Sequence, residues 1–200
     1  MKGFFIKILQ LMLQRVIMKA VACFGDSLIY GFPYGGEYSW INKVETLTGI
    51  KMLNYGSCGE TCVDIGHRMR FSNLSPNVDA LLFLGGANDV LQGTPASVST
   101  GELKKVLSFA AEKKLPISLV LPFISGEESC NPSLQALRNS FTEIAAGKAN
   151  IIDLMPAIGN QSDEIKAAYL DGFHPKSDVY ERMGIYAAPL IAKWLDILFK

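Results

Sequence analysis

The chain has 200 residues and a mass of 21.9 kDa, which is the size of a single domain. Apolar residues make up 49% of the sequence and charged residues 19%, a composition that excludes a disordered or collagen-like chain. The 19 basic and 19 acidic side chains cancel, so the overall charge predicts no binding to nucleic acid. The 4 cysteines are too few for a disulfide scaffold and are typical of a protein from the reducing cytosol.

Residues 1–19 differ from the rest of the chain, because they hold four basic side chains and no acidic one. They contain no apolar run long enough for a signal peptide or a membrane-spanning helix, so we expect a cytoplasmic protein. Polar residues at helical spacing predict a basic amphipathic extension over residues 1–17, followed by one folded domain over residues 18–200. Peripheral contact with an anionic membrane is one interpretation of the extension. Docking on its own domain, or a non-native leader before a start at Met18, is favoured because basic amphipathic patterns are weakly specific.

Five short apolar runs bounded by turn residues are predicted to be strands. In chain order they cover residues 20–24, 51–55, 80–84, 117–121 and 151–154. Runs of this length that are apolar on both faces suit a parallel sheet covered on two sides.

Helical patterns follow these strands, over residues 39–48, 62–71, 101–114, 134–146 and about 179–199. Asn131-Pro132-Ser133 is a start signal for the fourth helix. Pro189 is expected to kink the last helix or to start it afresh. The alternation predicts an α/β fold, namely a three-layer α/β/α sandwich whose five-stranded parallel sheet has the flavodoxin-like order 2-1-3-4-5.

Glycines and small polar residues follow several predicted strands, where an open α/β sheet binds its ligands. Gly25-Asp26-Ser27-Leu28 follows the first strand, Gly56-Ser57-Cys58-Gly59 the second, and Gly86-Ala87-Asn88-Asp89 the third. Asp171-Gly172-Phe173-His174 lies beyond the fifth. Together these segments supply a hydroxyl, backbone amides, a side-chain amide and an Asp/His pair, which is a set sufficient for acyl transfer.

Each segment also has a simpler interpretation when it is taken alone. Ser27 is a residue type that readily caps a helix, and Asp26 can tie down a turn through neighbouring amides. Asn88-Asp89 is compatible with an ordinary turn after a strand. The occurrence of all four segments at strand ends favours a catalytic site over four unrelated turns.

The four segments resemble the signature blocks of the SGNH (GDSL) hydrolase family, in the family's order and at its usual distances. The resemblance runs from about Met18 to the C-terminus and is closest to compact bacterial esterases, thioesterases and lysophospholipase-like enzymes. It implies a serine ester hydrolase that acts on a small ester or thioester through an acyl-enzyme. A carbohydrate O-acetylesterase and a non-catalytic α/β binding domain are the alternatives. No phosphate-binding or dinucleotide-binding glycine motif follows the first strand, so no cofactor is expected.

The chemistry of acyl transfer assigns a role to each candidate residue. Ser27 is the candidate nucleophile, and His174 is the base that takes its proton and returns it to the leaving group. Asp171 is close enough along the chain to orient the His174 ring. The resemblance implies that the backbone N–H groups of Ser27 and Gly56 and the side-chain amide of Asn88 stabilise the oxyanion.

The loops beyond the strand ends are expected to line a pocket for a small or medium acyl group. The loop over residues 28–34 supplies an apolar wall beside the nucleophile. The predicted substrate-binding residues are Leu28, Tyr30, Leu91 and Phe123.

Two further features do not predict chemistry. Cys58 and Cys62 are spaced like metal ligands but lack a second close Cys or His pair, so no metal site is predicted. His67 lies beside Arg68 and Arg70, which is typical of a solvated helix face.

Overall fold

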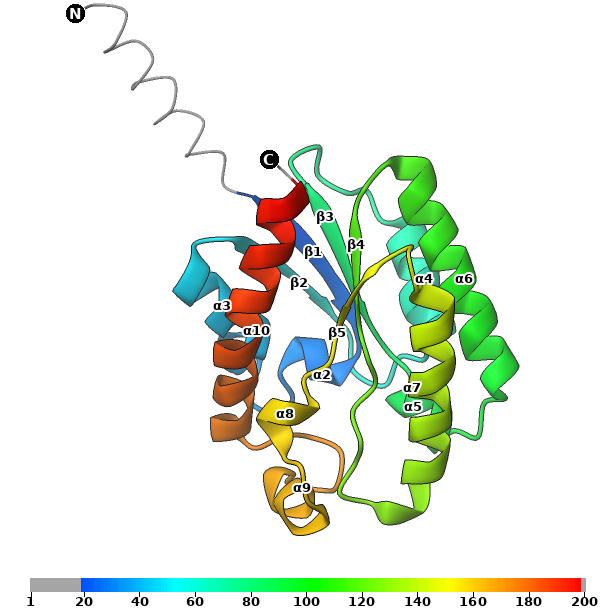
Figure 1. Cartoon of the computed structure of the whole chain (residues 1–200), viewed down its shortest axis with the longest axis vertical. Helices are drawn as coiled ribbons and strands as arrows, with labels where there is room; N and C mark the ends of the chain where they lie inside the picture. Colours follow the sequence, from blue (N-terminus) through cyan, green and yellow to red (C-terminus); the bar gives the residue numbers. More distant parts are fainter. Residues whose placement is uncertain (1–18, 199–200) are drawn as a thin grey trace, which may run out of the picture.

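The computed structural model describes residues 19–198, so the predicted extension over residues 1–17 lies outside the described residues. Five parallel strands form one sheet in the order β2-β1-β3-β4-β5 (Figure 1). The predicted fold class and strand order are therefore confirmed. The strands are β1 (Ala20–Gly25), β2 (Lys51–Gly56), β3 (Ala80–Leu84), β4 (Ile117–Val120) and β5 (Asn150–Ile152).

The centre of the sheet is buried on both faces. Every residue of β1, β3 and β4 is buried, as expected for strands that are apolar on both sides. Val21 and Cys23 pack into one core and Ala22 and Phe24 into the other, because successive side chains of a strand point to opposite faces. Strand β2 lies at the edge of the sheet and is only partly buried.

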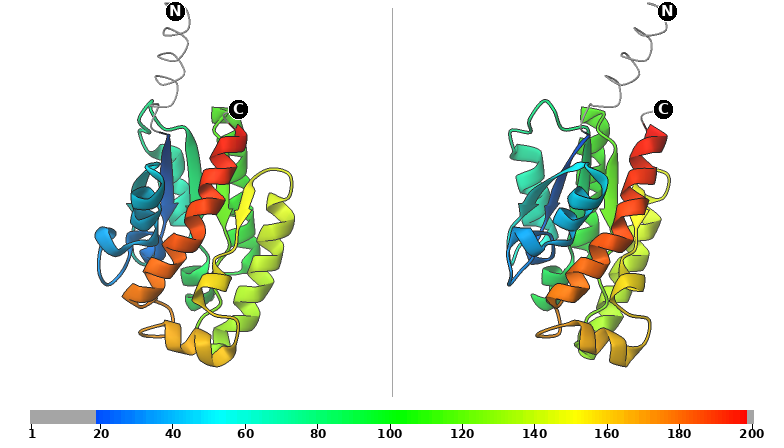
Figure 2. Two further views of the ribbon diagram at one scale, coloured as in Figure 1. Left: turned by 60° about the vertical axis from the view of Figure 1, so that its left-hand side comes forward. Right: turned by 90° about the vertical axis from the view of Figure 1, so that its left-hand side faces the viewer.

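Helices cover both faces and make the molecule a three-layer sandwich (Figures 1 and 2). Helices α3 and α10 lie side by side over one face, with the short α8 next to α10. Helices α4, α6 and α7 cover the other face. Their bounds are α3 Trp40–Thr48, α4 Cys62–Phe71, α6 Ala96–Lys113, α7 Asn131–Ala145, α8 Met155–Ile158 and α10 Ser177–Leu198.

The long helices occur where the apolar periodicity predicts them, with two differences. Helix α6 begins at Ala96, five residues before the predicted start, because its first turn is small and polar and carries no apolar period. Helix α10 runs without interruption through Pro189, so the expectation of a fresh start at this proline is wrong. No helix within residues 19–198 is both long and apolar enough to cross a lipid bilayer.

Short helices gather beyond the carboxyl ends of the strands, at the lower end of the sheet in Figure 1. Most of them were not predicted, because a helix of one or two turns is too short to show a period. They are α2 (Ser27–Tyr30), α5 (Ala87–Leu91), α9 (Ser162–Ala168) and the 3₁₀ turns Gly36–Tyr38 and Glu128–Cys130. Helices α2 and α5 carry two of the predicted site residues.

Candidate active site

Ser27 is the first residue of α2 and follows the end of β1 after a sharp turn. Asp26 is the N-cap of this helix, and its Oδ1 accepts the Leu28 N–H at 2.9 Å. The interpretation of Ser27 as the cap is therefore wrong, and the turn-forming role expected of Asp26 is confirmed. A Cβ at Gly25 would lie 2.4 Å from the Ile29 side chain, so only glycine lets the chain turn here. The Ser27 hydroxyl is consequently not used as a cap and contacts His174 instead.

A tight loop between α9 and α10 holds Asp171 and His174. Asp171 Oδ1 accepts the backbone N–H groups of Phe173 at 3.0 Å and of His174 at 2.8 Å. The other oxygen, Oδ2, lies 2.7 Å from His174 Nδ1, and His174 Nε2 lies 3.0 Å from Ser27 Oγ. An ionised carboxylate only accepts, so Nδ1 carries the proton and Nε2 accepts from the Ser27 hydroxyl. The structure thus brings together three side chains from two distant parts of the chain.

The Asp171 carboxylate is arranged to stay ionised. Burial acts to raise its pKa, but the hydrogen bonds from the His174 ring and from two backbone N–H groups outweigh burial and hold the pKa below its usual value. The negative charge that remains is well placed to stabilise a positively charged His174 ring.

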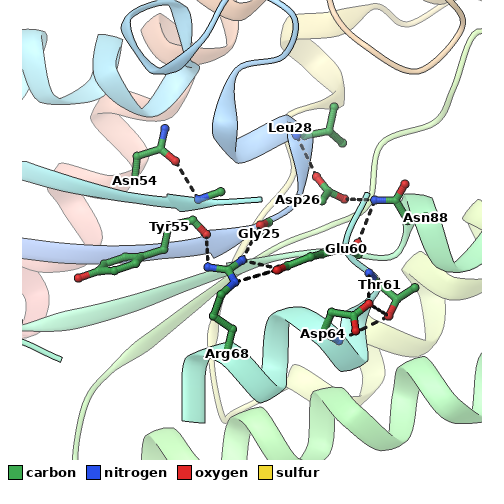
Figure 3. A network of polar contacts seen from close by, with 11 residues as sticks. Gly25, Asp26, Leu28, Asn54, Tyr55, Glu60, Thr61, Asp64, Arg68 and Asn88 are labelled. Atoms are coloured by element: carbon green, nitrogen blue, oxygen red, sulfur yellow. Dashed lines mark hydrogen bonds and ion pairs between the residues drawn. The ribbon is translucent and has the colours of Figure 1, made fainter. Parts of the chain in front are cut away.

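Asn88 lies in α5, directly beyond β3, and faces the turn that holds Ser27 (Figure 3). Its Nδ2 donates to the Glu60 carbonyl at 2.9 Å and lies 3.4 Å from Asp26 Oδ2. The second contact is long for a hydrogen bond. One N–H of this amide is therefore firmly held, and the other is only weakly engaged next to the nucleophile.

The Gly56 N–H points away from this site, which corrects the expectation that it stabilises an oxyanion. The N–H groups of Lys51 and Ser57 donate to β1, so the N–H of Gly56, one residue from Ser57, faces the outer edge of the sheet. There it donates to Asn54 Oδ1 at 2.9 Å. A Cβ at Gly56 would lie 2.2 Å from the Tyr30 nitrogen, so this glycine makes room for α2.

The next glycine, Gly59, lies closer to Asn88. It precedes Glu60, whose carbonyl accepts the Asn88 amide, and its φ of 81° is in the left-handed region that favours glycine. Within residues 19–198 the Gly59 N–H donates no hydrogen bond. The sequence signal that separates the two glycines is the alternation of N–H directions along an edge strand. Gly56 still belongs to β2, so its N–H direction is set by the strand, whereas Gly59 lies beyond the strand.

Two buried acids support the turn and α5. Burial raises the pKa of Asp26 to about 7, the Leu28 N–H acts to lower it, and the nearby charge of Asp89 adds to the rise. Asp89 accepts the Cys62 N–H at 2.8 Å and the Ser99 hydroxyl at 2.7 Å. Asp89 thus ties α5 to α4 and α6, while Asp26 directly precedes Ser27.

The four predicted substrate-binding residues fall into two pairs. Tyr30 and Leu91 are 42% and 49% exposed and are available to a ligand. Leu28 and Phe123 are each only 4% exposed and belong to the core that packs against α3 and α10. Their burial in this core does not support the expectation that they line the acyl pocket.

Phe32 is the aromatic residue of the loop over residues 28–34 that contacts the site. Its ring centroid lies 4.6 Å from that of His174, and the side chain is 39% exposed. The Phe32 carbonyl accepts the Tyr180 hydroxyl at 3.0 Å, which anchors the loop to α10. The sequence placed this residue in the predicted apolar wall, but only the structure shows that it touches the histidine.

Helix α4 is less solvated than its sequence indicates. His67 is exposed and packs against Phe71, as expected for a surface residue. Arg68 and Arg70 instead form ion pairs with Glu60 and with the buried Glu102. Both arginines are only partly exposed, so this face is less solvated than predicted; the partner of Arg70 lies 32 residues away in sequence, whereas that of Arg68 lies eight away.

The cysteines form no metal site in the part of the chain that the structure describes. All four are free thiols, and residues 19–198 contain no group of three or more His, Cys, Asp and Glu side chains that could hold a metal ion.

A model of the GDSL-like lipase/acylhydrolase family matches residues 23–182. The chain belongs to this family. Membership makes it a serine ester hydrolase of the GDSL (SGNH) type, as the sequence motifs predicted. No curated protein sequence matches the chain.

Solved structures of similar fold come from several bacteria. A lipolytic protein of the G-D-S-L family from Veillonella parvula has 18% identity and a TM-score of 0.76, over 87% of this chain and 98% of that one. The psychrotrophic esterase EstA from Pseudoalteromonas sp. has 21% identity and a TM-score of 0.74, over 89% and 99%. A GDSL-like lipase from Bacteroides thetaiotaomicron has 19% identity and a TM-score of 0.72, over 88% and 89%. At these identities the similarity shows a shared fold.

Proposed function

We propose that the chain cleaves small carboxylic esters or thioesters through an acyl-enzyme formed on Ser27, with His174 and Asp171 completing a triad. The observation that carries this proposal is the continuous line of hydrogen bonds, 3.0 Å from Ser27 Oγ to His174 Nε2 and 2.7 Å from His174 Nδ1 to Asp171. A structural serine needs no base, and a structural histidine needs no carboxylate aligned on its far nitrogen.

The reaction follows from these positions. Ser27 Oγ attacks the carbonyl carbon of the ester as His174 Nε2 takes the hydroxyl proton, which forms a tetrahedral intermediate. Collapse of the intermediate breaks the bond to the alcohol or thiol, and the leaving group takes the proton from Nε2. Water then repeats both steps on the acyl-enzyme, releasing the acid and restoring Ser27.

The oxyanion needs donors on the side of Ser27 that faces away from His174. We assign the Ser27 N–H, the weakly engaged N–H of the Asn88 amide and, in place of Gly56, the Gly59 N–H. Within residues 19–198 the Ser27 N–H, like that of Gly59, donates no hydrogen bond. Donors that are held in place before the reaction stabilise the developing charge without reorganising.

The position of Phe32 beside His174 indicates that Phe32 contacts the leaving group of the ester rather than its acyl group. His174 delivers its proton to the leaving group, so the leaving group lies on the side of the site where Phe32 packs against His174. Exposed Tyr30 is also available to apolar parts of a substrate. These aromatic surfaces favour a neutral, apolar leaving group.

Covalent labelling tests the proposal directly. A fluorophosphonate probe should add one phosphonyl group to the wild-type protein and none to Ser27→Ala, as measured by intact mass. Ser108→Ala, which removes an exposed serine on α6, is the matched control and should label fully. His174→Gln should abolish rapid labelling, whereas His67→Gln should not. A wild-type protein that does not label would contradict the proposal and would favour a non-catalytic binding domain.

A substrate panel tests the finer assignment. We expect p-nitrophenyl esters of short acyl chains to be cleaved faster than those of long chains, with an acyl-CoA and an acetylated sugar assayed alongside. Preference for the acetylated sugar would replace our assignment with a carbohydrate O-acetylesterase.

Location and partners remain predictions. We propose a cytoplasmic protein, supported by its four free cysteines, with a small ester or thioester as its ligand and no nucleic-acid partner. Membrane contact through residues 1–17 is not favoured, so chains with and without these residues should sediment equally with anionic liposomes.

A further inference from the structure

We propose that Arg68 is a positioning residue for the oxyanion side of the site, acting through the ends of β1 and β2 and the loop that follows β2. This inference rests on the proposed function, because it assumes that Ser27 and Asn88 act on one ester carbonyl.

The Arg68 guanidinium makes contacts with three separate pieces of chain (Figure 3). Its Nε lies 3.0 Å from both carboxylate oxygens of Glu60. Nη1 donates to the Tyr55 carbonyl at 2.7 Å, and Nη2 donates to the Gly25 carbonyl at 3.1 Å. The cation also lies 5.5 Å from the centre of the Phe24 ring. One side chain on α4 therefore joins the end of β1, the end of β2 and the loop beyond β2.

Two of these contacts, with Gly25 and with Glu60, lead toward proposed oxyanion donors. Gly25 precedes the Asp26–Ser27 turn, so its carbonyl helps to set the direction of the Ser27 N–H. Glu60 is bound to Arg68 through its carboxylate and to Asn88 through its backbone carbonyl, at 2.9 Å. Arg68 thus holds Glu60 in place, and Glu60 in turn holds the Asn88 amide. Arg68 itself does not contact Ser27 or His174.

The positive charge of Arg68 also favours the oxyanion, because it neutralises the carboxylate of Glu60. Glu60 places a partly buried carboxylate beside a site where negative charge must form, and an unpaired carboxylate there would oppose the oxyanion. The guanidinium pairs with that carboxylate in a two-oxygen contact. A lysine in this position would keep the charge, but its single ammonium lacks the planar fork that also reaches two carbonyls.

Helix α4 also supplies a matched control. Arg70 is two residues further on, is partly buried like Arg68, and pairs with Glu102 on α6. Among residues 19–198 its polar contact is with Glu102 and not with the loop or a strand end that carries the site. A change at Arg70 therefore removes a comparable ion pair without touching the oxyanion side.

The experiment compares Arg68→Met, Arg68→Lys and Arg70→Met by steady-state hydrolysis of p-nitrophenyl acetate, each well below its melting temperature. For Arg68→Met we expect kcat and kcat/KM to fall together by about 10–100-fold with KM changed less than about threefold, since only transition-state binding is lost. Arg68→Lys should recover part of this loss. Arg70→Met should lower the melting temperature while keeping kcat within about twofold of wild type.

A double-mutant cycle separates positioning from general destabilisation. In the Asn88→Ala background, Arg68→Met should lower kcat by a clearly smaller factor than in wild type, because the part of its effect that passes through the Asn88 amide is already lost. Full additivity, an unchanged kcat in Arg68→Met, or an equal loss in Arg70→Met would overturn the inference. These outcomes leave wild-type activity and Ser27 labelling intact, whereas failure of the proposed function would remove both.

Discussion

Removal of the Asn88 amide is the sharpest test of the oxyanion assignment. In Asn88→Ala the carbonyl of Glu60 loses its donor and Asp26 loses a weak one, while Ser27, His174 and Asp171 keep their contacts. The substitution therefore takes one donor from the transition state and leaves the nucleophile and base in place.

The structure indicates the size of the effect. Loss of one oxyanion donor typically lowers turnover by about 10²–10³-fold, which is roughly 2.7–4 kcal/mol. Of the two N–H groups on Asn88, one is occupied by Glu60 and the other faces Asp26 at 3.4 Å, so the second must leave Asp26 to bind the oxyanion. This competition places the expected loss in kcat near the lower limit, about 10²-fold, with KM changed little.

Hydrolysis of p-nitrophenyl acetate by wild type and Asn88→Ala gives kcat and KM, and urea unfolding of both proteins shows how much of each is folded. Loss of a donor to the partly buried Glu60 carbonyl should also lower the free energy of unfolding by about 1 kcal/mol. Asn139→Ala, which removes an exposed amide from α7, is the matched control and should match wild type. A fall in kcat of less than threefold in a folded Asn88→Ala protein would remove Asn88 from the oxyanion hole.

Three further results are expected from the same assays. Asp171→Asn should lower kcat/KM by at least about 10²-fold, because an amide stabilises neither the Nδ1–H tautomer nor the charged ring of His174; a loss below tenfold would argue against the triad. Phe32→Ala should raise KM for phenyl and naphthyl esters by about fivefold and leave methyl esters unchanged, since only aromatic leaving groups lose a packing partner; equal changes would contradict the assigned side. Asp26 has a pKa of about 7 when folded and a lower one when unfolded, so the folded state binds more protons between about pH 4 and pH 7, and the contribution of this carboxyl to stability falls as the pH rises. From pH 5 to pH 8, urea unfolding should therefore show Asp26→Asn gaining about 2–3 kcal/mol relative to wild type; a constant difference would refute the raised pKa.

Local pattern was sufficient for most of the fold. Strands β1, β3 and β4 are short runs that are apolar on both faces, and such runs fit only the inside of a covered parallel sheet. The five long helices show the apolar period that a core-facing helix requires. Helix α5 escaped prediction because so short a helix has no period to detect.

The residues of the site were predictable where motif and chemistry agree. Ser27, Asp171 and His174 were chosen because a hydroxyl needs a base and the base needs an orienting carboxylate, and the structure brings all three into hydrogen-bonding distance. Asn88 was chosen from a motif at a strand end, and the structure places its amide beside Asp26.

The amino-acid sequence by itself determined where the strands and the long helices lie along the chain and which side chains can react, because these depend on local periodicity and on residue type. Only the tertiary structure decided which way a group points and what it touches. The Gly56 N–H faces outward because its position in an edge strand sets its direction, and Leu28 and Phe123 are buried because distant helices cover them. Arg68 reaches Glu60, Tyr55 and Gly25 only after three segments have been folded against one another, and contacts of that kind leave no local pattern in the chain.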